Sequence, residues 1–543
     1  MSQRPGPRRG REPRAEKIEA PWRRPTVEVA AALLVSAAAL LIRARLLDVP
    51  LERDEGEYAY GAQLLLAGER FYHGFYAMKL PGIHLAYAAL ISIFGPAARG
   101  IHSGLALIDA LSGAALFILA RRFWGGLCAV AALAAFLLMA LGISVQGYQA
   151  NAEHFVLLPA LAGLVLLTQA APGGRNRLLF ASGLCLGTAI AMKQHGVLFA
   201  AFSTLMLIVE AARDRERRRL LIGGLLAHAA GLALPLGILL GAIAAHGDFG
   251  RFYFLCVSYA RHYISIQPPA AALRDLLWAL RGLFRDAPVF WILAAIGLAR
   301  SFRADTGRPQ ARFAVLFLLF SFLATVPGLW FRPHYFILLL PAVALLAGIG
   351  VAQFASDRRR APAWMLLLFA VGHTLFAQRQ VLFQLDPAQI SRKTYWTMPF
   401  TEAIPIADFV RENTGPRDTV AIVGSEPEIL FYARRRSATG YIYGYPLTEP
   451  HPFMDRMIDE MIREVESSRP KIVIHESGMW SWGTQVAARR RIAAWVQAYT
   501  DRDYEQVGVL EWTWAGPVCT WGVMARDLRP PGNDWMRIYL RRS

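Results

Sequence analysis

The stretch VEVAAALLVSAAALLIRARLLDVPLERDEGEY, residues 27–58, decides how the rest of the chain is interpreted. Its first part, 27–47, is an apolar run that is long enough to cross a bilayer as a helix. The run is also longer than the apolar core of a signal peptide, which favours an uncleaved anchor. The charged segment 53–57 follows directly. The sequence therefore predicts a membrane anchor that opens onto a group of carboxylates.

The composition of the whole chain indicates a membrane protein. Of its 543 residues, 55% are hydrophobic and only 18% are charged, whereas about a quarter of the residues of a soluble protein are charged. Further apolar runs lie at 98–120, 124–144, 154–171, 178–192, 196–210, 220–245, 287–299, 313–331, 335–354 and 363–378. The sequence therefore predicts an α-helical polytopic membrane protein with about 11 transmembrane helices.

Positive charge follows the segments between these runs. The net charge is +18, and nearly all of it lies in the N-terminal segment and in short loops. The loops contain Arg121-Arg122, Arg175–Arg177, Arg213–Arg219, Arg300–Arg312 and Arg358–Arg360. Placing them all on the cytoplasmic side satisfies the positive-inside rule, and an odd number of spans then puts the C-terminus outside. A nucleic-acid surface would instead gather its charge on one soluble domain, so we expect no nucleic-acid partner.

These patterns divide the chain into three parts. Residues 1–26 form a basic cytoplasmic N-terminus, and 27–384 form a transmembrane domain with outer loops at 48–97 and 246–286. Residues 385–543 are more polar and predict an extracytoplasmic α/β domain. Its helix-like stretches are 402–413, 452–467 and 485–499, and its strand-like stretches are 418–424, 470–475, 506–513 and 518–525. Ala- and Arg-rich usage suggests the plasma (inner) membrane of a bacterium.

The adjacent carboxylates Asp54 and Glu55 stand at the outer mouth of the first span. Holding such groups charged in a partly dry site is costly, and one of them could act as a general base on a sugar or lipid hydroxyl. The pattern also fits a structural role, with Asp54 as the N-cap of a helix and Glu57 three residues on. The two interpretations are compatible, because a helix N-terminus also fixes the position of a carboxylate.

Several short motifs around this pair resemble a known family, the integral-membrane GT-C glycosyltransferases. Within that family the chain resembles the family-39-like group, which includes the protein O-mannosyltransferases and the bacterial aminoarabinose transferase that modifies lipid A. The resemblance rests on Arg53-Asp54-Glu55 with Tyr58, on Gly68, Tyr72 and Lys79-Leu80-Pro81, on Phe94-Gly95 and Arg99, and on Arg121-Arg122. The family usually has Lys-Pro-Pro where this chain has Lys79-Leu80-Pro81. The sequence resembles the family well over residues 50–210 and more weakly from there to residue 350. Beyond residue 350 only the overall architecture is similar.

The resemblance implies an enzyme that takes a sugar from a polyprenyl-phosphate carrier on the outer face of the membrane and passes it to an acceptor. Asp54 matches the catalytic carboxylate of the family and Glu55 its partner, with Arg53 and Tyr58 as supporting residues of the same motif. A polyprenyl phosphate leaves as a stabilised anion, so one base opposite the leaving group is enough for inversion.

Basic residues on the predicted outer side are candidates for the donor phosphate. They are Lys79, Lys193 and Arg332, with Tyr335 close to the last. Each also has a structural interpretation. Lys79 fits an interfacial lysine, and the 332–335 segment fits an aromatic-belt anchor. Lys193 lies near the membrane interior, where a charged residue is a functional hypothesis by default.

Glu153 and His154 lie where the third span turns into the fourth. Glu153 fits a second acid, a metal ligand or a contact to the donor sugar, and equally a loop that caps the next helix. Glu55, Glu153 and His154 are candidates for a divalent metal, but their spacing is not a metal signature. The sequence leaves the metal open, and it names neither the sugar nor the acceptor.

Two other classes of function compete with an enzyme. A transporter or flippase for an envelope lipid would also place charged residues at the outer mouth, but no paired Gly- or Pro-broken helices mark two symmetric halves. A non-catalytic assembly factor would use the outer domain to recruit a partner. In all three cases the expected partners include membrane lipids.

Overall fold

The computed structural model describes most of the chain. The described residues are 27–170, 176–213, 218–303, 309–356, 359–513 and 516–542. The basic segment 1–26 lies outside them, as do parts of four of the predicted arginine-rich loops.

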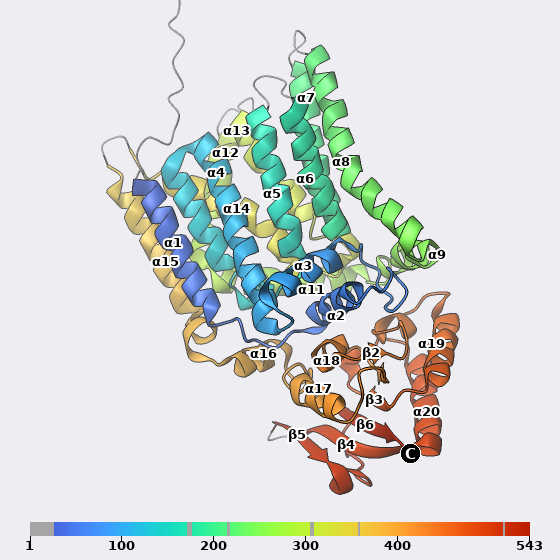
Figure 1. The fold of residues 1–543 in the computed structure, drawn as a ribbon. Helices are drawn as coiled ribbons and strands as arrows, with labels where there is room; N and C mark the ends of the chain where they lie inside the picture. The colour runs from blue at the N-terminus through green and yellow to red at the C-terminus, as the bar shows by residue number, and fades with distance from the viewer. Residues whose placement is uncertain are drawn as a thin grey trace, which may run out of the picture.

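A layer of long helices forms the first part of the molecule (Figure 1). These helices are α1 (Val27–Ala44), α4 (Ala98–Met139), α5 (Ala152–Ala170), α6 (Asn176–Met192), α7 (Val197–Arg213), α8 (Arg218–His246), α12 (Pro288–Arg303), α13 (Pro309–Leu323), α14 (Leu340–Ala352) and α15 (Ala361–Ala377). Each predicted apolar run overlaps one of them. The prediction of a helical polytopic membrane protein is confirmed.

Length and composition identify fewer spans than the sequence predicts. Within the described residues, 5 helices are long and apolar enough to cross a membrane, or up to 6 if one bent pair is counted as a single span. Five shorter apolar helices accompany them. The number of about 11 spans stays a prediction.

The longest helix, α4, contains two of the predicted runs. Its course breaks at Gly125, whose φ of 84° is left-handed and is a conformation that glycine adopts without a steric penalty. The two halves then lie side by side, because a Cβ on Gly113 would stand 2.8 Å from the side chain of Leu133. In a straight helix these residues would be about 30 Å apart. α4 is therefore a helical hairpin, as the separate runs 98–120 and 124–144 predict.

Shorter helices cover one end of this layer, between the long helices and the sheet (Figure 1). They are α2 (Arg53–Leu66), α3 (Gly82–Phe94), α9 (Phe249–Tyr253), α10 (Ala260–Tyr263) and α11 (Pro269–Asp286). They occupy the predicted outer loops 48–97 and 246–286. α11 meets α12 at an angle of 105°, so it lies across the ends of the long helices.

The C-terminal part combines helices with one sheet. Its elements are α16 (Pro387–Tyr395), α17 (Ala403–Glu412), β1 (Thr419–Val423), α18 (Pro427–Ala433), β2 (Arg436–Ser437), α19 (Met454–Ser468), β3 (Ile472–Glu476), α20 (Val486–Asp503), β4 (Tyr504–Thr513), β5 (Gly516–Trp521) and β6 (Trp535–Arg541). The strand order is β2-β1-β3-β6-β4-β5. β1 is parallel to β2 and β3, and the other pairs are antiparallel.

The sheet differs from the sequence prediction at β2, β5 and β6. The two-residue strand β2 was not predicted. The last strand of the chain, β6, was not predicted, although it lies in the middle of the sheet between β3 and β4. The predicted strand 518–525 is too long, because β5 ends at Trp521 and 522–525 form a 3₁₀ turn. Gly522 causes the change of direction, with a φ of 66°.

The C-terminal part shares its core with the membrane part. One hydrophobic cluster includes Tyr58 and Ala59 of α2 together with Ile422 of β1 and Ile429 of α18. The two helices α2 and α18 approach closely at Gly56, where an added Cβ would lie only 2.5 Å from the backbone nitrogen of Glu428. The absence of a side chain at Gly56 lets α18 pack directly on the helix that begins at Arg53.

We expect Gly56→Ala to loosen this contact. The methyl group has no space against the backbone of α18, so the cost is that of overpacking, about 1–3 kcal/mol. The thermal unfolding midpoint of the purified chain in detergent should fall. Gly241→Ala in α8, where a Cβ meets nothing within 4 Å, is the control and should leave the midpoint unchanged or slightly raised, because Ala is favoured over Gly inside a helix. Equal midpoints for both variants would contradict the close packing at Gly56.

Candidate active site

The helix α2 begins with a capping box that the sequence analysis placed two residues too late. The N-cap is Glu52, whose side chain accepts from the backbone N–H of Glu55, while the side chain of Glu55 accepts from the backbone N–H of Glu52. The prediction that Asp54 is the N-cap is therefore wrong. Because Glu52 and Glu55 satisfy the helix terminus, the carboxylate of Asp54 is left for other contacts.

Asp54 lies in a polar cluster at the end of the long helices. Its Oδ1 accepts hydrogen bonds from Lys79 Nζ at 2.9 Å and from the hydroxyl of Tyr443 at 3.0 Å. Its Oδ2 stands 3.8 Å from Nε2 of His334. Burial would raise the pKa of Asp54, but the charges of Lys79 and His334 outweigh burial and hold the pKa well below its usual range.

Lys79 is the cation at the centre of this cluster. Besides Asp54 it contacts Glu57 Oε2 at 2.8 Å, and its Nζ stands 4.4 Å from the ring centroid of Tyr58. Glu57 also lies 3.5 Å from His84. Glu57 was not among the site residues predicted from the sequence. The signal was present, because Asp54, Glu57 and Tyr58 are spaced i, i+3 and i+4 and so share one face of a helix.

A second ion pair lies behind the first. Lys193 is paired with Glu153 at the start of α5, and its Nζ stands 4.3 Å from the ring centroid of Tyr335. His334 joins the two groups, since its ring packs edge-on against Tyr335 and faces Asp54. The structure therefore brings together Asp54, Lys79, Lys193, Tyr335 and Glu153, as the sequence predicts for one site.

Arg332 borders the same site but differs from the two lysines. Its guanidinium carbon lies 5.0 Å from the ring centroid of Trp330, which in turn stacks on Tyr263 of α10. The side chain is exposed. Within the described part of the chain it has no carboxylate partner, so its charge is not neutralised by an ion pair.

Two of the predicted site residues, Glu55 and His154, point elsewhere. Glu55 is buried on the other side of α2, where it accepts from the backbone N–H of Ala150 at 2.6 Å and contacts His102 at 2.8 Å. His154 pairs with Asp109, at 2.7 Å, inside the helical layer. Neither reaches the cluster around Lys79.

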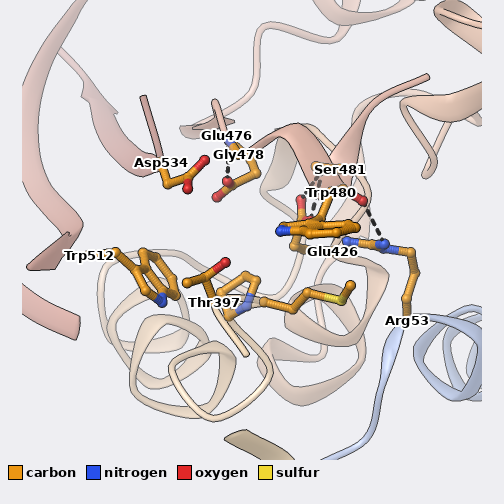
Figure 2. A pocket seen from close by; sticks show the side chains of 11 residues that line it. Arg53, Thr397, Glu426, Glu476, Gly478, Trp480, Ser481, Trp512 and Asp534 are labelled. Carbon is orange, nitrogen blue, oxygen red and sulfur yellow. Dashed lines mark hydrogen bonds and ion pairs between the residues drawn. The ribbon is translucent and has the colours of Figure 1, made fainter. Parts of the chain in front are cut away.

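Arg53 holds the C-terminal part in place. Its guanidinium group donates to the backbone oxygen of Ser425, to the hydroxyl of Tyr445, to the backbone oxygen of Trp480 at 2.9 Å and to Glu426 at 3.1 Å. Figure 2 shows this side chain at the edge of a small pocket that also contains Glu476 and Asp534. Arg53 therefore has a docking role next to the site.

The metal candidates from the sequence are Glu55, Glu153 and His154. Within the ranges that the structure describes, no group of three His, Cys, Asp or Glu side chains is arranged to hold a metal ion. Each of these three side chains has a different partner. Glu55 contacts His102, Glu153 contacts Lys193 and His154 contacts Asp109.

Comparisons with known proteins bear on the fold that carries this site. A family model described as dolichyl-phosphate-mannose-protein mannosyltransferase matches residues 79–238. No curated protein matches the chain. The solved structure of ArnT from Cupriavidus metallidurans in the apo state has a TM-score of 0.57 at 17% identity, covering 83% of this chain and 93% of that one. The same protein bound to undecaprenyl phosphate gives 0.56 at 16% identity, covering 82% and 93%.

A third solved structure is similar over more of the chain. The archaeal oligosaccharyltransferase AglB from Archaeoglobus fulgidus, in complex with an inhibitory peptide and a dolichol-phosphate, has a TM-score of 0.51 at 13% identity and covers 92% of this chain and 75% of that one. These solved structures show that the chain shares their fold, so the resemblance to the GT-C membrane glycosyltransferases is confirmed at the level of the fold.

We expect Glu55→Ala to reduce stability. The variant loses the capping box and leaves the buried N–H of Ala150 without an acceptor, at a cost of about 1–3 kcal/mol. The thermal unfolding midpoint in detergent should drop. Asp48→Asn, which breaks an exposed ion pair with Arg99, should change it little. A stable Glu55→Ala protein without transfer activity would instead support the catalytic role predicted from the sequence.

Proposed function

We propose that the protein is a glycosyltransferase that moves a sugar from a polyprenyl-phosphate donor to an acceptor, with inversion and with Asp54 as general base. The accessibility of Asp54 carries this proposal. Its side chain is 25% exposed, whereas those of Glu57, Glu55 and Glu153 are at most 1% exposed. Asp54 is therefore the carboxylate of this region that a substrate can reach.

The proposed step is a single displacement at the anomeric carbon. The acceptor oxygen forms a bond to this carbon while the bond between the carbon and the phosphate oxygen of the carrier breaks. The acceptor proton passes to Asp54 Oδ2, which has no hydrogen-bond donor within 3.5 Å among the described residues. The bonding electrons leave with the carrier, so the products are the glycosylated acceptor and polyprenyl phosphate.

Charge balance suggests how the cations divide their roles. Lys79 faces two carboxylates and Lys193 faces one, whereas Arg332 has no carboxylate ion-pair partner among the residues that the structure describes. We therefore propose Arg332 as the main contact of the donor phosphate, with Lys193 and Tyr335 behind it. Lys79 completes the phosphate site and also keeps Asp54 ionised. Arg guanidinium groups suit this role, because they bind phosphate oxygens with two parallel hydrogen bonds.

The orientation in the membrane follows the same proposal. Transfer on the outer face of a bacterial plasma membrane requires the ends of the helices that carry α2 and α3 to face outward. The arginine-rich segments between the long helices then face the cytoplasm, in agreement with the positive-inside rule.

Asp54→Asn is the direct test of the proposal. The substitution keeps the size and one acceptor oxygen but removes the base, and Glu52 still caps α2. Transfer should fall by about 10²–10⁴-fold. Mass spectrometry of envelope glycolipids and lipid-linked sugars, in a deletion strain complemented with either gene at matched expression, should show the sugar adduct only with wild type. Asp48→Asn should behave as wild type. Full complementation by Asp54→Asn would remove the carboxylate from the mechanism.

A pH profile tests the link between Lys79 and Asp54. In wild type the pKa of Asp54 is held low, so Asp54 stays ionised and we expect no acid limb above about pH 4. In Lys79→Met the lowering charge is lost while burial remains, so the pKa rises and transfer should be lost as the pH falls between about pH 7 and pH 4. Tyr443→Phe removes a neutral hydrogen bond and should shift the limb less. An unchanged profile in Lys79→Met would contradict the assignment.

A further inference from the structure

A large groove opens beside the candidate active site, and none of the residues proposed to bind the donor or to act as base lines it. Its volume is about 660 Å³, within the range of ligand-binding clefts. It lies between α11, the end of α15, α16 and the loop that precedes α5. Its lining residues include Trp278, Arg281, Arg285, Gln146, Lys393 and Trp396.

The groove is positively charged. Arg281, Arg285 and Lys393 line it, and Asp286 is the lining carboxylate. Asp286 is already engaged, because it accepts from the backbone N–H of Ser144 at 3.0 Å and lies 3.4 Å from Arg285. Arg281 is exposed and has no ion pair among the residues that the structure describes. The groove therefore suits an anionic group.

The rims of the groove carry features of a membrane interface. Trp278 and Trp396 are 67% and 78% exposed, and exposed tryptophans are typical of the level of the lipid headgroups. On α11 the exposed residues Leu273, Leu277 and Phe284 form an apolar stripe, and Arg281 and Arg285 lie on the side of the helix that lines the groove. A helix of this kind lies in the headgroup region and attracts anionic lipids.

The inner end of the groove reaches the active site. Gln146 lines the groove, and its side-chain oxygen lies 3.3 Å from Nδ1 of His334. The other ring nitrogen of His334 faces Asp54 Oδ2. Pro333 also lines the groove. One histidine thus separates the groove from the proposed base.

We infer that this groove is the acceptor site and that the acceptor is an anionic membrane lipid. Its phosphate-bearing headgroup lies between Arg281, Arg285 and Lys393, and its acyl chains pass between Trp278 and Trp396 into the bilayer. A hydroxyl of the headgroup then reaches Asp54 past His334. The inference rests on the proposed function, whose donor phosphate occupies the other side of Asp54, at Arg332.

Lipid binding by the full-length protein tests the charge of the groove. The purified chain in detergent is titrated with phosphatidylglycerol and with phosphatidylcholine of the same acyl chains, and bound lipid is counted by native mass spectrometry. Phosphatidylglycerol should bind more tightly. Arg281→Gln with Lys393→Gln should weaken it by about 25-fold, since each charge near an anionic lipid contributes about fivefold. Arg281→Lys should retain most of the binding.

Arg274→Gln is the matched control, because Arg274 is an exposed arginine on the same helix that does not line the groove. It should leave binding unchanged. Equal losses for Arg274→Gln and Arg281→Gln, or equal binding of the two lipids, would overturn the inference. Undecaprenyl phosphate added to the phosphatidylglycerol complex should bind beside it. If it instead displaces the phospholipid and loses affinity in the Arg281→Gln, Lys393→Gln protein, the groove is a donor site and the inference fails.

The acceptor assignment and the proposed function fail in different ways. Asp54→Asn should bind phosphatidylglycerol like wild type while transfer is lost. The product of wild type should carry its sugar on an anionic lipid, as mass spectrometry of the extracted envelope lipids would show. A sugar found on protein alone would overturn the acceptor class but leave transfer by Asp54 intact. Transfer that survives in Asp54→Asn would remove the proposed base, whatever the groove binds.

Discussion

The ion pairs of Lys79 are the interaction on which the site depends. A single ammonium group is held by Asp54, Glu57 and the ring of Tyr58, all from one face of α2. A buried charge is tolerated only when its partners repay the loss of hydration, and here two carboxylates surround one cation. Because Lys79 comes from the loop before α3, these contacts tie that loop to α2. The proposed base and its nearest cation are therefore positioned as one unit.

The C-terminal part completes this unit from the other side. Tyr443 donates to Asp54, and its hydroxyl lies equally close to the backbone oxygen of Arg53. The Arg53 side chain in turn donates hydrogen bonds to the backbone oxygens of Ser425 and Trp480. Since α2 and α18 also share a hydrophobic core, a movement of the C-terminal part would carry Tyr443 away from Asp54. The C-terminal part of the chain thus forms one wall of the site.

The sequence predicted the features that depend on local pattern or on motif spacing. Long apolar runs predicted the helices, and the spacing between Asp54 and Lys79 indicated a common site. The strand β6 was not predicted because Arg537 and Arg541 interrupt its apolar pattern. In the structure the guanidinium carbon of Arg537 lies 4.1 Å from the ring centroid of Trp535. The contact of Tyr443 with Asp54 was not predicted because the two residues are almost 400 positions apart in the chain, and no local pattern encodes such a contact. The capping box was predicted two residues too late because Asp is a preferred N-cap residue and Glu is not, so residue preference alone favours Asp54 over Glu52.

The backbone between α13 and α14 gives a physical reason for two separate approaches to Asp54. Gly328, Leu329 and Phe331 all have positive φ, at 76°, 56° and 42°, and left-handed non-glycine residues cost about 1–3 kcal/mol each. Such strain persists only where the surroundings impose it. Its effect is to turn Arg332 toward Trp330 while Pro333 lines the groove. Arg332 and Pro333 thus face different directions, an arrangement that the proposed inversion would use, because nucleophile and leaving group must lie on opposite sides of the anomeric carbon.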